Sequence, residues 1–490
     1  MNKRAVSHIT AVVTLVIGLA MGVCGGLSLY WNDPANIPAG FFISAGITVC
    51  IALLLSFLTR GDFNLTRRDG FGIVTFGWIF AALFGALPYI VSGIIPEINE
   101  AVFETMSGFT TTGASVLPSA APGYDTLESL PRGILFWRSL TQWFGGMGVL
   151  VLCVAILPFL GVGGMQIYRA EMPGPAKDRL TPRITTTAKL LWGVYFFITV
   201  MQALLLHFIA GLTWFDAVCH SFTTIATGGF STRTDSIGAY ASPSVDWIVT
   251  AFTFIAGINF ALHYRALSGR PLSYFRDPEC RFYFVFLFIS GIFFAFNTLP
   301  LYAGNFAESL RAGFFQGTTI ITTTGYSTAN YDLWPSSSRM LLGIMMFTGA
   351  CAGSTSGGVK LVRVFVILKK MLKEIRQFMR PQAVLQIKLG GRPVGDEVEA
   401  NIAAFFGIYI GIFIVTSFLM TFFLPDLSSA ITAVLTTLSN VGPGFGAVGP
   451  VHDYAGISLF GQIILTGCML LGRLELYTVL VLFLPGFWKK

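Results

Sequence analysis

Long apolar runs without a charged residue alternate along the chain with short basic segments. Residues 9–30, 41–58 and 402–424 contain no Asp, Glu, Lys or Arg. Each run is close to the roughly 20 apolar residues that a helix needs to cross a bilayer. The pattern predicts an all-α polytopic membrane protein with about ten transmembrane helices. Their expected positions are 8–30, 39–59, 71–92, 136–160, 188–211, 247–267, 282–301, 340–370, 401–424 and 458–485.

Four shorter, mostly apolar stretches lie between these expected spans. A helix of about 13 residues is only about 20 Å long, whereas the hydrocarbon core is about 30 Å thick. Such stretches are too short to cross a membrane and are predicted to be re-entrant helices. They lie at 98–110, 213–226, 308–322 and 427–439.

Each short stretch ends in a similar glycine-containing string. The four strings are Phe109-Thr-Thr-Thr-Gly113-Ala-Ser, Thr224-Ile-Ala-Thr-Gly228-Gly-Phe, Ile321-Thr-Thr-Thr-Gly325-Tyr-Ser and Leu438-Ser-Asn-Val-Gly442-Pro-Gly. The key glycines are 115, 97 and 117 residues apart by subtraction, far more than the repeat length of a solenoid protein. The repeating unit is therefore a spanning helix, a re-entrant helix, a Thr/Gly turn and a second spanning helix.

Four copies of this unit follow two additional N-terminal helices. The predicted boundaries are 1–69 for the two N-terminal helices, then 70–160, 161–270, 271–390 and 391–490 for repeats 1 to 4.

Composition and charge agree with this class of protein. Hydrophobic residues make up 54% of the chain and charged residues 11%, with a mean hydropathy of +0.71. A soluble chain carries about 25% charged residues. The basic residues concentrate in alternate loops, and the positive-inside rule then puts both termini in the cytoplasm of a bacterial inner (plasma) membrane. The net charge of +7 therefore needs no nucleic-acid partner.

The four Thr/Gly turns suggest a cation pathway. Non-helical backbone at membrane depth is stable only where protein or a water-filled cavity surrounds it. Turns that meet around one axis would satisfy this condition, and their carbonyl oxygens could replace the hydration shell of a cation. Gly113, Gly228, Gly325 and Gly442 would provide the unusual backbone dihedral angles. The partially negative C-terminal ends of the short helices would also favour a cation.

A run of ten small residues interrupts the eighth expected span. It extends from Gly349 to Gly358. Each glycine costs about 1 kcal/mol relative to alanine in a helix, so the run is predicted to unwind into an intramembrane loop. Close helix packing through small residues is the alternative interpretation.

Arg473 lies near the middle of the last expected span. A central arginine is costly in a bilayer and usually faces protein or water. Glu475 is two residues away and faces another side of the helix. Arg473 is therefore expected either in a pore or in a structural contact with another carboxylate or carbonyl.

Other classes of function find less support in the sequence. The seven cysteines and five histidines are dispersed and suggest no metal cluster and no nucleophile–base constellation, so an enzyme is not expected. The four strings contain no acidic residue, unlike the filter of a less selective cation channel. A secondary cation symporter with broken helices and inverted repeats remains an alternative. Repeats of two spans each, however, all insert in the same sense.

Taken together, these motifs resemble the Trk/Ktr/HKT superfamily of potassium transporters. The resemblance rests on the four strings, on Asn440-Val-Gly-Pro-Gly444 and on Gly353-Ser-Thr-Ser-Gly-Gly-Val-Lys360. The two additional N-terminal helices resemble the TrkH/TrkG branch. The resemblance implies a potassium pore within one subunit, with K⁺ as the transported ion and no organic cofactor. It also implies a homodimer and a cytoplasmic nucleotide-binding regulatory subunit of the TrkA type.

The resemblance also implies roles for particular residues. Because sodium-preferring relatives have serine in place of the first filter glycine, Gly113 implies a preference for potassium. The implied selectivity filter is Thr111, Thr112, Gly113, Ala226, Thr227, Gly228, Thr323, Thr324, Gly325, Asn440, Val441 and Gly442. The implied gate is Gly349, Gly353, Ser354, Thr355, Ser356, Gly357, Gly358 and Arg473.

Overall fold

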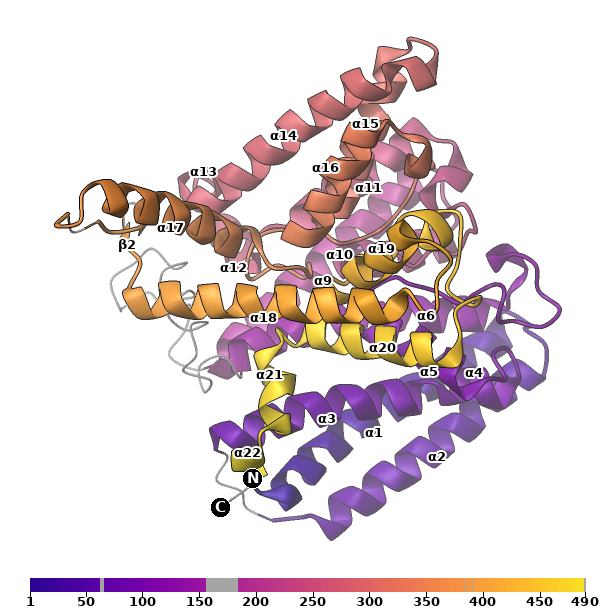
Figure 1. Cartoon of the computed structure of the whole chain (residues 1–490). Coiled ribbons are helices and arrows are strands. Elements are labelled where there is room, and N and C mark those ends of the chain that lie inside the picture. The colour runs from indigo at the N-terminus through magenta and orange to yellow at the C-terminus, as the bar shows by residue number, and fades with distance from the viewer. Residues whose placement is uncertain (62–65, 156–183, 384, 391, 489–490) are drawn as a thin grey trace.

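The computed structural model describes residues 1–61, 66–155, 184–383, 385–390 and 392–488 (Figure 1). Helices dominate these residues. The strands among them are β1 (Lys388–Leu389) and β2 (Arg392–Pro393), which pair antiparallel in a small hairpin. The prediction of an all-α polytopic membrane protein is confirmed. One of the basic segments of the sequence, residues 169–189, lies mostly outside the described residues.

Two long helices precede the repeats. Helix α1 (Lys3–Tyr30) packs against α2 (Asn36–Leu58), and both also contact the first repeat. Their outer faces are apolar and exposed, with side chains such as Leu19, Val23 and Leu54 more than half exposed. Such faces suit contact with lipid rather than water.

The remaining helices follow one order four times. The first set is α3 (Arg67–Gly85), α4 (Leu87–Ser92), α5 (Ile98–Phe109), the 3₁₀ turn η1 (Leu127–Ser129) and α6 (Arg132–Ala155). The second set is α9 (Ile184–Phe208), α10 (Trp214–Ile225), η2 (Ser236–Tyr240), α11 (Pro243–Ala256) and α12 (Phe260–Leu267). The third set is α13 (Ser273–Arg276), α14 (Pro278–Thr298), η3 (Leu299–Tyr302), α15 (Phe306–Ile321), η4 (Tyr331–Leu333), α16 (Ser336–Thr348) and α17 (Leu361–Met379). The fourth set is α18 (Asp396–Met420), α19 (Leu427–Leu438), η5 (Gly446–Val448), α20 (Leu459–Arg473), α21 (Tyr477–Leu480), η6 (Val481–Phe483) and α22 (Pro485–Trp488).

Among the described residues, fewer unbroken spans are present than the ten expected for the whole chain. Six of the described helices are long and apolar enough to cross a membrane, or up to eight if each of two bent pairs counts as one span. The expected span at 136–160 continues beyond the described residues, and that at 340–370 is divided between α16 and α17. The bent pairs are α11–α12, at 100°, and α20–α21, at 111°.

The four short helices α5, α10, α15 and α19 lie within two residues of their predicted positions. We call them the pore helices. Three of them begin with a side-chain cap, because Thr213, Asn305 and Asp426 each accept a hydrogen bond from the N–H three residues ahead. Such caps satisfy backbone donors that a helix start leaves free.

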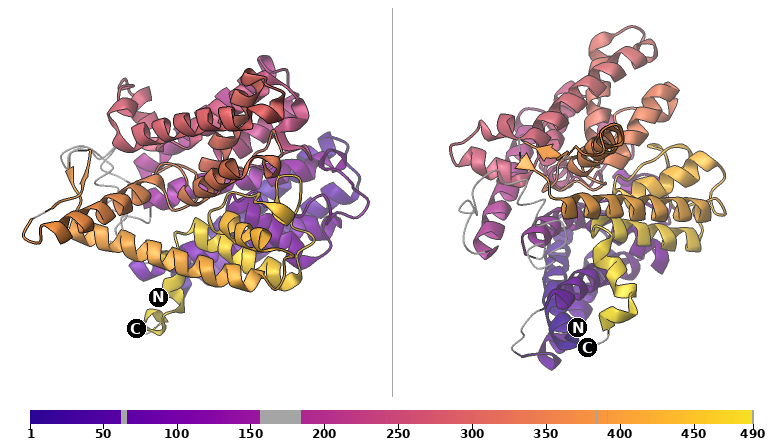
Figure 2. Two further views of the ribbon diagram at one scale, coloured as in Figure 1. Left: turned by 45° about the horizontal axis from the view of Figure 1, so that its top comes forward. Right: turned by 60° about the vertical axis from the view of Figure 1, so that its left-hand side comes forward.

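Contacts between repeats close the four sets into a ring. Helix α6 packs against α10, α11 against α15, α16 against α19, and α20 against α5. Figure 2 shows the yellow C-terminal helices beside the purple segments of the first repeat. Each repeat therefore contacts the pore helix of the next, and the fourth contacts that of the first.

Candidate functional site

All four pore helices end in the same hydrogen-bonded turn. One N–H donates to the carbonyl three residues earlier, and the next N–H donates to the carbonyl five residues earlier. This pair of bonds is the Schellman motif, and it requires a left-handed residue directly after the cap. The left-handed residues are Thr111, Thr227, Thr323 and Asn440, with φ of 51°, 53°, 58° and 55°. The five-residue bonds are Thr112 to Ser107 (2.9 Å), Gly228 to Thr223 (2.8 Å), Thr324 to Thr319 (2.7 Å) and Val441 to Thr436 (2.7 Å).

Threonine is an unusual residue for this backbone conformation. Its branched Cβ makes a left-handed φ a genuine outlier that costs about 1–3 kcal/mol, whereas Asn tolerates it. The hydroxyl of Thr323 accepts a hydrogen bond from the Gly357 N–H at 2.7 Å. Within the described part of the chain, the buried hydroxyl of Thr111 has no hydrogen-bond partner. Strained residues of this kind cluster at functional sites.

A left-handed glycine follows two residues later in every repeat. These glycines are Gly113, Gly229, Gly325 and Gly442, with φ of 84°, 78°, 81° and 100°. In the second repeat the equivalent of Gly113 is thus Gly229 and not Gly228. Gly228 instead occupies the position of Thr112, Thr324 and Val441, and Ala226 is the cap residue of α10. The second string is therefore in register with the other three over residues 227–229, because the Schellman motif centres on Thr227.

The four glycines bring each string against the next. A Cβ atom placed on any of them would lie less than 3.0 Å from a carbonyl oxygen of a neighbouring repeat. The pairs are Gly113 with Gly228, Gly229 with Thr324, Gly325 with Val441, and Gly442 with Thr112. The four carbonyls occupy equivalent positions, and the fourth contact returns to the first repeat. We call this closed arrangement the carbonyl ring.

Side-chain hydrogen bonds hold the ring in place. The Gln142 amide donates to the Gly228 carbonyl at 2.7 Å, and the Tyr454 hydroxyl donates to the Gly442 carbonyl at 2.7 Å. The Asn440 amide donates to the Thr112 hydroxyl at 2.9 Å, which ties the fourth repeat to the first. Hydrogen bonds from surrounding side chains and between neighbouring repeats therefore fix the positions of the strings.

The predicted unwinding at Gly349–Gly358 is confirmed. Helix α16 ends at Thr348 and α17 begins at Leu361, and we call residues 349–360 the intramembrane loop. Gly349, Gly353 and Gly358 adopt left-handed φ values of 69°, 72° and 72°. Within the loop, the Ser354 and Ser356 hydroxyls are 2.8 Å apart.

The intramembrane loop lies against the ends of three pore helices. The Thr355 hydroxyl donates to the carbonyl of Ile225, the last residue of α10, at 3.0 Å. Gly357 reaches the third string through its bond to Thr323, and its Cα lies so close to the Ser439 carbonyl that a Cβ atom there would overlap it. The loop thus lies directly beneath the carbonyl ring, on the side where the pore helices end.

One carboxylate connects the intramembrane loop to the first turn of α17. Glu279, at the start of α14, accepts hydrogen bonds from the N–H groups of Ala352 (2.9 Å) and Val362 (3.1 Å). Sequence reasoning did not identify this residue. Its only sequence signal is an acidic residue at the start of an apolar run.

Arg473 is the last residue of α20, at the 111° bend, and not in the middle of a continuous span. Two strained residues, Glu475 and Leu476, each with a φ of 54°, make the bend. The guanidinium donates to the carbonyls of Thr355 (2.8 Å) and Gly145 (3.3 Å). Arg473 therefore joins the intramembrane loop to α6.

Glu475 points away from this contact. Its carboxylate forms a 2.6 Å ion pair with Arg363 in the first turn of α17. The segment that carries Arg473 is thus also connected to the helix that follows the intramembrane loop.

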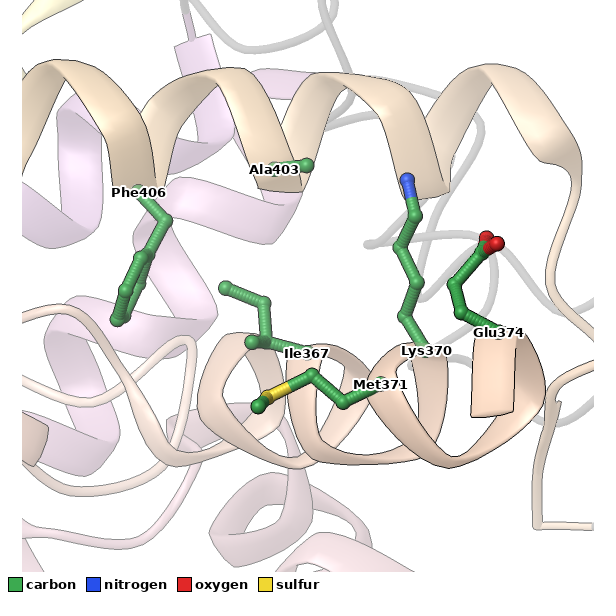
Figure 3. A pocket seen from close by; sticks show the side chains of 6 residues that line it. All are labelled: Ile367, Lys370, Met371, Glu374, Ala403 and Phe406. Carbon is green, nitrogen blue, oxygen red and sulfur yellow. The ribbon is translucent and has the colours of Figure 1, made fainter. Parts of the chain in front are cut away.

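A shallow hollow lies apart from the ring. It has a volume of about 250 Å³ and is formed by α17 and α18, with Lys370 and Glu374 at one end (Figure 3). Its other lining residues are Ile367, Met371, Ala403 and Phe406. No residue of the strings or of the intramembrane loop lines it, so it is not part of the candidate site.

The fold and the site define an integral membrane transport protein in which four pore loops meet around one axis. Residues 39–490 match the family model TrkH, described as a cation transport protein. The chain belongs to this family. Its relatives are named as transport proteins, and the family is not one of enzymes.

Individual relatives match over the full length. The Trk system potassium uptake proteins TrkH of Salmonella typhimurium (strain LT2) and Escherichia coli (strain K12) are each 41% identical, with 100% of both chains covered. TrkG of Escherichia coli (strain K12) is 33% identical and covers 100% of this chain and 99% of its own length. The crystal structure of the potassium transporter TrkH from Vibrio parahaemolyticus has a TM-score of 0.90 at 33% identity, with 100% of both chains covered.

The close approach at Gly229 can be tested by thermal unfolding of the purified protein. Gly229→Ala should reduce stability by roughly 1–3 kcal/mol more than Gly211→Ala, because only the first forces a Cβ into a packed site. Gly211 is the matched control, since its φ is 74° and no atom lies within 4 Å of its added Cβ. Equal losses in the two variants would contradict the assigned register of the second string.

Proposed function

We propose that this chain takes up potassium across the bacterial inner (plasma) membrane through the carbonyl ring. The observation that carries the proposal is the closed set of equivalent glycine–carbonyl approaches between the four repeats. A ring of backbone carbonyls is how a protein replaces the water around a potassium ion. The names of the relatives, which are potassium uptake proteins, support the choice of ion.

The proposed filter comprises residues 111–113, 227–229, 323–325 and 440–442. None of these residues is charged, so cation preference would come from oxygen dipoles and from the C-terminal ends of the pore helices. Two buried oxygens, Thr111 Oγ1 and Asn440 Oδ1, have no hydrogen-bond partner among the described residues. Such oxygens at equivalent positions are suited to an incoming cation.

The alternative of a secondary symporter has one feature in its favour, namely the broken helices α11–α12 and α20–α21. Inverted repeats would alternate in direction around the site. Here each repeat contacts the next in a single rotational order. This order supports a pore with an axis normal to the membrane.

The intramembrane loop and Arg473 are proposed to form the gate. Both lie beneath the ring, and Arg473 Nη1 is 2.8 Å from the Thr355 carbonyl oxygen. A cation passing at about 4 Å from the guanidinium would be repelled by roughly 4 kcal/mol at an effective dielectric constant of about 20. Opening therefore requires the loop to move and to take the arginine away from the path or shield it.

The proposed assembly is a homodimer with both termini in the cytoplasm, controlled by a nucleotide-binding subunit of the TrkA type. The domain boundaries remain those predicted from the repeats: 1–69, 70–160, 161–270, 271–390 and 391–490. Helix α17 begins at the end of the intramembrane loop and carries the exposed Arg376 in its last turn, with the exposed Arg380 as the residue that caps its end. A partner bound there could act directly on the loop.

Ion-replacement flux in liposomes that contain only the purified chain tests the proposed function. Rapid K⁺ flux with little Na⁺ flux is expected. In Gly113→Ser the ratio of K⁺ to Na⁺ flux should fall about tenfold, which corresponds to 1.4 kcal/mol, because the new Cβ displaces the Gly228 carbonyl. Gly123→Ser is the control, since Gly123 has the same φ of 84° but open space around it. An unchanged ratio in folded Gly113→Ser would contradict the filter.

Removing the gate charge should increase flux. Arg473→Ala is expected to raise K⁺ flux about tenfold or more without changing ion selectivity, because the repulsion is lost while the ring is intact. Removing part of the intramembrane loop should have the same effect. Folded yield is measured in parallel, with Arg132→Ala on the exposed start of α6 as the control. Reduced flux at normal yield would exclude a gating role for Arg473.

Control by a partner predicts a salt-dependent interaction with α17. Arg376→Gln combined with Arg380→Gln should weaken binding of the purified regulatory subunit about tenfold at low salt, since surface charge favours association. Arg270→Gln, on another exposed loop, is the control. Binding would be measured with the chain in nanodiscs. Full switching of flux by nucleotide alone, without the subunit, would contradict the need for a partner.

A further inference from the structure

A buried ion pair lies behind the first two strings. Arg138 in α6 and Glu104 in the pore helix α5 form a 2.7 Å contact, with side chains 2% and 0% exposed. Removing two charges from water is expensive, and a hydrophobic pair of similar volume is often as stable. The pair is therefore not explained by stability alone.

Arg138 holds equivalent residues of two neighbouring repeats. Its Nη2 donates to the Ser115 hydroxyl at 3.0 Å, and its Nη1 donates to the Ser231 carbonyl at 3.1 Å. Ser115 follows the left-handed Gly113 by two residues, and Ser231 follows Gly229 by two. The guanidinium also lies 4.2 Å from the centre of the Phe230 ring. One rigid planar group thus connects the segments that leave the first and second filter strings.

Glu104 completes the connection on the side of the first repeat. Its Oε2 accepts hydrogen bonds from the Val116 N–H (3.0 Å) and the Ser115 hydroxyl (3.0 Å). The Glu104 carboxylate thereby holds both Arg138 and the segment that follows Gly113 in the first repeat.

The other pore helices carry different side chains at this register, seven residues before the left-handed residue. They are His220, Gln316 and Ala433. His220 Nε2 lies 3.0 Å from the Ser231 hydroxyl, and the Gln316 amide, in the orientation that satisfies both of its polar atoms, accepts a hydrogen bond from the Thr328 N–H at 2.8 Å. Alanine cannot form such a bond. Side-chain support of the segment after the filter is thus common to three repeats. Among the described residues, an ion pair provides this support only between the first and second repeats.

One turn after Arg138 in α6, Gln142 contacts the second string. Its amide N–H donates to the Gly228 carbonyl (2.7 Å), and its Oε1 accepts from the Phe230 N–H (3.1 Å). Arg138 and Gln142 are four residues apart, so they share one face of the helix. Movement of α6 would therefore be transmitted to the carbonyl ring.

We propose that the Glu104–Arg138 pair is a positioning device that fixes the spacing between the first and second filter strings and so contributes to ion selectivity. This inference rests on the proposed function. The discrimination of K⁺ from Na⁺ depends on where the carbonyls are held and how far they can move. The planar fork of arginine can hold Glu104, Ser115 and Ser231 together, whereas an ammonium group lacks this geometry.

Arg138→Lys tests the proposal because it retains the positive charge and removes the fork. We expect folded protein with measurable K⁺ flux and a K⁺/Na⁺ flux ratio about tenfold lower, equivalent to 1.4 kcal/mol. The matched control is Arg311→Lys, since Arg311 also connects two repeats through a 3.0 Å ion pair, with Asp246, and among the described residues it forms no hydrogen bond with a filter string. The control should leave the ratio unchanged.

A second variant, Glu104→Gln, keeps the side-chain volume and an acceptor for the Val116 N–H while it removes the charge. It should also lower the ratio. An unchanged ratio in folded Arg138→Lys and Glu104→Gln would overturn the proposal, as would an equal fall in Arg311→Lys. Failure of both variants to fold would assign the pair to folding instead. Absence of K⁺ flux in the unaltered chain would count against the proposed function and is thus a distinct result.

Discussion

The structure depends on one constraint, which is that non-helical backbone at membrane depth must be enclosed by protein. Each pore helix ends in a Schellman motif that turns the chain at Thr111, Thr227, Thr323 or Asn440. The strings that follow are enclosed by one another, because each left-handed glycine leaves room for a carbonyl of the next repeat. No single repeat could provide such an enclosure. The ring therefore requires all four copies, and the contacts from α6 to α10 through α20 to α5 follow from it.

The same constraint accounts for the breaks in the second helices. The interruptions of the helices at Gly257 and in the intramembrane loop satisfy each other's backbone hydrogen bonds. The Cys351 N–H donates to the Gly257 carbonyl (3.1 Å), and the Phe260 N–H donates to the Gly353 carbonyl (3.0 Å). The breaks bring small residues against the ends of the pore helices. A side chain on Gly257 would lie 2.8 Å from the Thr322 methyl group. The breaks thus form part of the enclosure of the strings and also place a loop beneath them.

The strings contain no charged residue, and the charged side chains of this region lie on either side of them. Arg473 lies on the side where the pore helices end, and the Glu104–Arg138 pair lies where the strings continue beyond their glycines. The connection from α17 through Arg363 and Glu475 reaches the segment that carries Arg473. A movement of α17 would therefore affect both the loop and the arginine. Such contiguous contacts are the physical means by which distant sites are coupled.

The sequence alone determined the membrane class, the four short helices to within two residues and the unwinding at Gly349–Gly358, because hydrophobic length and glycine content act locally. It took Gly228 as the equivalent of Gly113, and no local pattern separates Gly228 from Gly229, since either adjacent glycine can adopt a left-handed φ. Tertiary structure decided that choice through the Schellman motif at Thr227 and the approach of the Thr324 carbonyl. Tertiary structure also placed Arg473 at a bend between two helices and brought Glu104 into an ion pair with Arg138. A charged residue inside an apolar segment signalled Arg473. The sequence analysis did not single out Glu104 or Arg138, because only the packing of separate helices brings residues distant in the chain into contact.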